Sequence, residues 1–77
     1  VCIKIQRVFV HGRLYERFLE AFVARTEALA VGDPLDPETV VGPLTEPVHV
    51  ERVKAWIDEA VAGGARLRCG GTVEGQV

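Results

Sequence analysis

A segment rich in proline and glycine divides the chain in two, and no other feature limits the fold so strongly. Residues 33–44 hold two Asp-Pro steps and one Gly-Pro step. The residue before each proline is restricted to extended backbone, so a helix cannot continue through this segment. The sequence therefore predicts a long ordered loop here, with a separate regular element on either side.

The segment before the loop has the apolar periodicity of a helix, from about Arg13 to Ala30. Apolar side chains at three- and four-residue steps predict one buried stripe, made of Leu14, Phe18, Phe22 and Leu29 with Leu19 and Thr26 beside them. The opposite face carries like-charged neighbours four residues apart, so we interpret it as a solvated face: Arg13, Glu16, Arg17, Glu20 and Glu27. Gly32 is expected to end the helix in the left-handed conformation.

A second helix is predicted after the loop, ending at about Ala62. Thr45 is the expected N-cap, with Glu46 and Pro47 in the first turn, where an acid suits the helix dipole and proline loses no hydrogen bond. The predicted buried stripe comprises Val50, Val53, Ile57, Ala60 and Val61, with Trp56 at its margin. His49 has no acidic residue placed to orient it, so a role as catalytic base is not favoured.

Two strands are predicted outside the helices. Apolar side chains at positions 3, 5 and 8–10 indicate a strand that becomes buried on both faces and ends at His11 and Gly12. Residues 65–69 alternate apolar with basic side chains, which is typical of a strand with one wet face. The expected fold class is α/β, in the order strand, helix, loop, helix, strand, with the helices packed on a small sheet.

Length and composition limit the partners that this chain requires. With 77 residues, 48% apolar but only 6% aromatic, it forms one small unit that has difficulty covering both faces of a sheet. We therefore expect a homo-oligomer, such as a symmetric dimer, or a complementary chain. The net charge of −2 without a basic stripe argues against nucleic acid. Without an apolar run of roughly 18 to 20 residues or a secretion signal, we expect no membrane partner and a cytoplasmic location.

Two cysteines stand near opposite ends of the chain. Cys2 leads into the first predicted strand, and its thiolate would be the strongest nucleophile available at neutral pH. A lone cysteine among Val and Ile is also often a small buried hydrophobe, so the pattern alone leaves both interpretations open. Cys69 falls on the apolar face of its strand and is predicted to pack. Neither cysteine has ligands at metal-binding spacing, and a disulfide between them is disfavoured in a reducing compartment.

Three strings in the sequence resemble one known family. They are residues 1–3 with 6–11, residues 31–37 through 42–44, and residues 63–67 through 69–71. In this order and at these separations they closely resemble the NAD(P)-dependent aldehyde dehydrogenase superfamily, in the part of its catalytic domain that begins at the nucleophilic cysteine. The resemblance runs over essentially all 77 residues.

The resemblance implies that Cys2 is the catalytic thiol, which attacks the aldehyde and leaves a thioester for water to cleave. It also implies that the backbone N–H of Cys2 is one donor to the oxyanion. The family's nucleotide-binding domain, oxyanion asparagine, general-base glutamate and Glu-x-Phe-Gly-Pro segment have no counterpart in residues 1–77. We therefore expect a partial catalytic domain, from a truncated or split gene, that binds no cofactor, although the full-length family uses NAD or NADP and an aldehyde substrate.

Alone, such a chain is expected not to oxidise aldehydes. One alternative is a stand-alone α/β module that associates with itself or docks onto a partner without catalysis. A third hypothesis, a thiol-redox protein, has little support because Cys2 has no resolving cysteine nearby.

Overall fold

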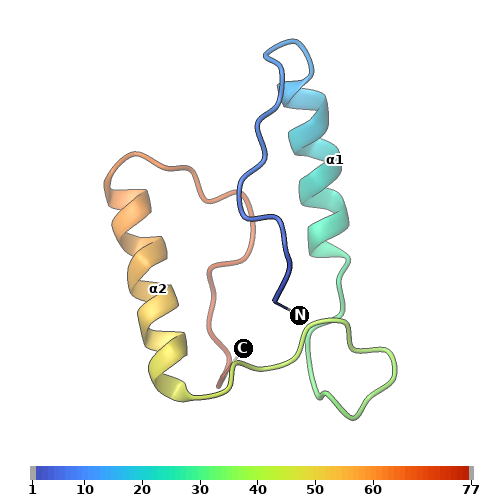
Figure 1. The fold of residues 1–77 in the computed structure, drawn as a ribbon, viewed down its shortest axis with the longest axis vertical. Coiled ribbons are helices and arrows are strands. Elements are labelled where there is room, and N and C mark those ends of the chain that lie inside the picture. Colours follow the sequence, from blue (N-terminus) through green and yellow to red (C-terminus); the bar gives the residue numbers. More distant parts are fainter. Residues whose placement is uncertain (1, 77) are drawn as a thin grey trace.

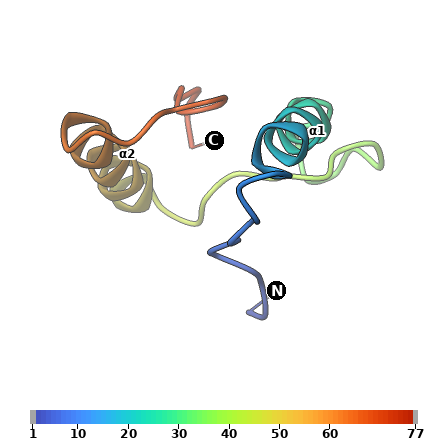
Figure 2. The same cartoon turned by 90° about the horizontal axis from the view of Figure 1, so that it is seen from above.

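The structure is a computed structural model that describes residues 2–76. It contains two α-helices, α1 (Tyr15–Glu27) and α2 (Pro47–Ala62), which lie apart without contact between them (Figure 1). Viewed from above, the C-terminal segment runs between the helices, and the N-terminal segment projects away from this layer (Figure 2). Neither helix is long and apolar enough to cross a bilayer, within the residues described.

Helix α1 confirms the first predicted helix, although it is shorter at both ends than the predicted residues 13–30. At its start the N–H of Leu14 donates to the carbonyl of His11 at 2.9 Å, so these residues form a turn that precedes the helix. At its end Ala28 is the C-cap and donates to the carbonyl of Ala24 at 3.2 Å. Periodicity thus located the helix, and hydrogen bonds in the flanking turns decided its limits.

The loop between the helices is ordered by its own hydrogen bonds, as predicted. Val31 and Val41 form an isolated parallel bridge, in which the N–H of Gly32 donates to the carbonyl of Val41 at 3.1 Å. The prediction that Gly32 adopts the left-handed conformation is wrong, because this bridge holds its backbone instead. The carboxylates of Asp33 and Asp36 each accept an N–H from two residues ahead, at 2.8 and 2.9 Å, which is typical of Asx turns.

Helix α2 begins one residue later than predicted and ends where predicted. Glu46 occupies the N-cap position with extended backbone, φ −141° and ψ 150°, so the prediction of Thr45 as N-cap is wrong. Pro47 stands in the first turn, where its missing N–H has no helical partner to lose. After Ala62 the backbone of Gly64 has φ 107°, a conformation that favours glycine, and the chain turns away from the helix.

The small core lies where α2 meets the C-terminal segment. Val50 is 8% exposed and is the only buried residue between positions 2 and 76. It shares an apolar groove with residues from α2 and from the two segments beside it: Leu44, Val53, Lys54, Ile57, Gly71, Thr72 and Val73. The N–H of Leu44 donates to the backbone carbonyl of Gln76 at 2.7 Å, and the Gln76 side-chain amide returns a bond to the Leu44 carbonyl at 2.8 Å. These two bonds close the C-terminal segment over α2.

The predicted stripe of α1 is not buried. Phe18 and Phe22 stack on each other, with ring centroids 5.4 Å apart, yet both remain exposed. The most covered side chains of α1 are Leu19 and Val23, one step around the helix from that stripe. The prediction of a buried Leu14–Leu29 stripe is therefore wrong for this chain, since no second segment lies over the stripe.

The predicted sheet is also wrong, because residues 2–76 contain no β-strand. Residues 3–10 run without regular structure, and their backbone groups bond to no other described residue. Residues 65–69 likewise pair with no strand. A strand needs a hydrogen-bonded neighbour, and this chain brings none alongside either segment. The helices consequently do not pack on a sheet.

Candidate functional site

Cys2, the predicted nucleophile, lies in the N-terminal segment with its side chain exposed. Its thiol is free, and it hydrogen-bonds to no other residue of the described range. Cys69, at the other end of the chain, is also a free thiol. The geometry therefore offers an accessible sulfur at Cys2 but no acid or base in contact with it.

Both histidines are engaged in local hydrogen bonds. The backbone N–H of Arg13 donates to Nδ1 of His11 at 3.1 Å, and a guanidinium nitrogen of Arg52 lies 3.0 Å from Nδ1 of His49. Each imidazole is held within its own turn or helix. Across residues 2–76, the His, Cys, Asp and Glu side chains form no group of three suited to a metal ion.

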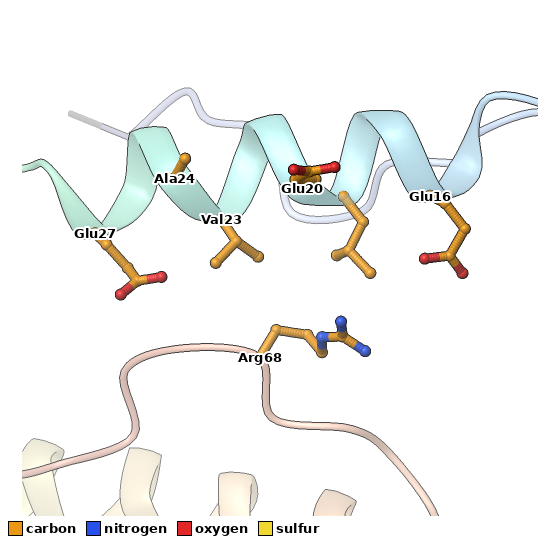
Figure 3. Close-up of a pocket in the computed structure, with 7 residues that line it drawn as sticks. Glu16, Glu20, Val23, Ala24, Glu27 and Arg68 are labelled. Carbon is orange, nitrogen blue, oxygen red and sulfur yellow. The ribbon is translucent and has the colours of Figure 1, made fainter.

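A hollow of about 500 Å³ lies between α1 and the segment that carries Arg68 (Figure 3). Val23 points from α1 toward Arg68, while Glu16 and Glu27 flank it on either side in that view. The hollow is lined by Glu16, Leu19, Glu20, Val23, Ala24, Glu27 and Arg68. The acidic residues predicted to be merely solvated are exposed, as expected, but they also surround a basic residue of a distant segment.

Cys69 lies beside the C-terminal end of α1 and the Val31–Val41 bridge. It is half-buried and lines a hollow of about 310 Å³ together with Thr26, Glu27, Leu29, Val31, Val41 and Gly70. Its thiol therefore contacts apolar side chains, in keeping with the predicted packing role. Cys2 lines neither this hollow nor the one around Arg68.

Two interactions were not anticipated from the sequence. The guanidinium of Arg52 lies over the ring of Trp56, 5.4 Å from its centroid, while it also contacts His49. Their three- and four-residue spacing on one helix is a signal that could have found this cluster. The pairing of Leu44 with Gln76 has no such signal, because the two residues are 32 positions apart.

Known sequences resemble the chain over almost its whole length. The 3-sulfolactaldehyde dehydrogenase of Priestia aryabhattai is 41% identical over 75 residues, which are 97% of this chain and 16% of that protein. The succinate-semialdehyde dehydrogenase [NADP(+)] of Mycobacterium leprae is 49% identical over 70 residues, which are 91% of this chain and 15% of that protein.

A solved structure shows the same arrangement of the chain in space. Aldehyde dehydrogenase 21 from Physcomitrella patens, in complex with the reaction product succinate, matches with a TM-score of 0.95 and 38% identity. The match covers 100% of this chain and 16% of that one. The present chain thus spans about a sixth of the length of the relatives that it matches. The profile of the aldehyde dehydrogenase family matches residues 1–77, and the chain belongs to this family.

Proposed function

We propose that this chain supplies the nucleophilic cysteine of an aldehyde dehydrogenase, and that residues 1–77 form part of its catalytic domain. The observation that carries the proposal is a free, exposed thiol at Cys2 in a chain that matches the family over its full length. A thiolate adds readily to an aldehyde carbonyl, and it departs readily from the acyl group that oxidation leaves on it.

The backbone at Cys2 has a second role in the proposed reaction. Attack of the sulfur on the carbonyl carbon places negative charge on the aldehyde oxygen, and a nearby N–H stabilises that charge. The N–H of Cys2 is attached to the residue that attacks, so it is the donor that this chain itself provides. Oxidation then gives a thioester, and water releases the carboxylic acid.

The described residues do not fit a nicotinamide dinucleotide, which accepts hydride in the NAD(P)-dependent family. A dinucleotide phosphate binds best at a helix N-terminus that follows a glycine-rich turn. Helix α1 follows Leu14, and helix α2 follows Glu46, whose carboxylate would repel a phosphate. We therefore propose that the chain alone binds neither NAD nor NADP and does not oxidise aldehydes.

The proposed substrate is a short aldehyde that carries an anionic group at its other end. Two relatives are named for succinate semialdehyde and 3-sulfolactaldehyde, and the solved neighbour holds succinate. These molecules share a small carbon chain with a carboxylate or sulfonate. Their common chemistry supports this substrate class for the complete enzyme to which the chain would contribute.

A graft tests the role of Cys2. This chain replaces the matched 70-residue segment of the Mycobacterium leprae enzyme, and NADPH formation from succinate semialdehyde is measured. The graft is expected to be active, and Cys2→Ala is expected to lower kcat about 10³-fold or more because the nucleophile is lost. Cys69→Ala is the matched control and should retain activity. A graft whose activity survives Cys2→Ala would refute the proposed role.

The isolated chain provides a complementary measurement. Its NADH or NADPH production with the same aldehyde is expected to equal that of its Cys2→Ala variant, because the chain holds no cofactor. Turnover well above that control would contradict the proposed inactivity.

The second candidate function is a stand-alone module that associates with itself. The observation in its favour is the exposure of large apolar side chains in the N-terminal segment, with Ile3 92% and Phe9 91% exposed. Light scattering over a range of concentrations distinguishes the two functions. A stable dimer of the isolated chain would favour the module, whereas a monomer would count against it.

A further inference from the structure

The N-terminal segment has two open backbone edges. None of the N–H or carbonyl groups of residues 3–10 bonds to another described residue. In an extended segment these groups point alternately to both sides, so two neighbouring strands are needed to satisfy them. Water can solvate such a segment, but its apolar side chains then gain nothing from burial.

The side chains of this segment are apolar on both faces. Ile3, Ile5 and Phe9 alternate onto one face and are highly exposed. Val8 and Val10 fall on the other face, and Val10 is half-buried in a hollow that it shares with Leu14, Arg17 and Phe18 of α1 and its approach. A strand that is apolar on both faces belongs in the interior of a covered sheet. Helix α1 covers one of these faces, and nothing in residues 2–76 covers the other.

The arrangement of the two helices indicates what completes this surface. They do not touch, yet the whole chain superposes on the solved plant enzyme with a TM-score of 0.95. The spacing between the helices is therefore that of a larger domain, of which this chain matches 16%. In that domain the remainder of the polypeptide must keep the helices apart. A second copy of this chain has no such reason to preserve the spacing.

We infer, resting on the function proposed above, that residues 3–10 and the Phe18–Phe22 side of α1 form a docking surface for the remaining part of an aldehyde dehydrogenase domain. The partner adds a strand to each edge of residues 3–10 and covers the face of Ile3, Ile5 and Phe9. The segment becomes a strand only in this complex.

Hydrogen exchange in the graft described above tests this surface. The backbone amides of residues 4–10 are expected to exchange at the rate of an unstructured peptide in the isolated 77-residue chain. In the graft they are expected to exchange about 10³-fold more slowly, because the added strands accept their hydrogen bonds. Unprotected amides in a folded graft, or a graft that does not fold, would overturn the inference.

Two variants of the graft locate the contact. Phe9→Glu and Phe18→Glu are each expected to lower the ratio of folded to unfolded graft by about tenfold or more, since each puts a carboxylate into an apolar contact. Ala55→Glu is the matched control, because it places the same carboxylate on the exposed face of α2. Equal effects at the three positions would overturn the docking surface.

The remaining outcomes separate the occupants and the two proposals. Protection of residues 4–10 that appears in the isolated chain as its concentration rises would identify a second copy as the occupant and overturn the inference. A folded graft with protected amides but no aldehyde oxidation would support the docking surface and refute the proposed function of Cys2.

Discussion

The two helices of this chain are built from similar apolar patterns but are packed to different extents. Helix α2 buries Val50 against the C-terminal segment, which returns to it and is held by the paired bonds between Leu44 and Gln76. Helix α1 buries no residue, and Phe18 and Phe22 stack only on each other. An amphipathic pattern therefore specifies a helix, but burial of its stripe depends on whether another segment of the chain reaches it.

Glycines make the return to α2 sterically accessible. Gly70 and Gly71 have φ of 71° and 77°, in the region that other residues enter at a cost. A Cβ at Gly71 would lie 2.6 Å from Cδ2 of Leu67. No equivalent reversal brings residues 3–10 back over the exposed side of α1. In the isolated chain, α2 and the C-terminal segment should thus hold most of the stability.

Val50→Asp should have the largest effect on this difference. The substitution buries a carboxylate without a partner, and we expect it to destabilise α2 by about 3 kcal/mol or more. Far-UV circular dichroism of the isolated chain should show loss of helix. Val48→Asp is the matched control, since Val48 is exposed and an acid in the first turn suits the helix dipole. Equal losses from both variants would show that α2 is no better packed than α1.

Gly71→Ala tests the chain reversal. We expect a loss of about 1–2 kcal/mol, because alanine is strained at this φ and Leu67 must also move. Gly75→Ala is the control, with a φ of 64° but no atom within 4 Å of the added Cβ, so it should lose only the backbone contribution. Urea unfolding followed by circular dichroism measures both. A smaller loss at Gly71 than at Gly75 would contradict the role of the Leu67 contact.

Gln76→Ala should have the smallest effect. It removes the side-chain bond to the Leu44 carbonyl but leaves the backbone bond, and the site is exposed, so we expect a loss of about 0.5–1 kcal/mol. Gln6→Ala, in the unpaired N-terminal segment, should leave stability unchanged. The same urea measurement applies. A comparable loss at Gln6 would mean that residues 3–10 are structured in the isolated chain, which would remove the contrast between the two regions.

Helix positions were predictable because their causes are local. Apolar steps of three and four residues located both helices, and the proline-rich loop separated them. The errors at Thr45 and Gly32 are different in kind. Thr45 and Glu46 are adjacent candidates for one cap, and the backbone of Gly32 is held by Val41, a residue outside the local pattern.

The candidate site shows the same division. Cys2 was identified by its place in a family motif, and its catalytic role stays a prediction. The structure adds that its thiol is free and exposed. The acidic hollow around Arg68 was not predicted, because spacing within α1 carries no information about a residue in another segment.

The sequence by itself determined the two helices, the loop between them and membership of the aldehyde dehydrogenase family, because periodicity, proline, glycine and motif spacing are read within short stretches. Tertiary structure alone decided that α2 is covered, that α1 is not, and that residues 3–10 and 65–69 stay unpaired. The physical reason is that burial and strand pairing need a second surface, which must come from distant residues.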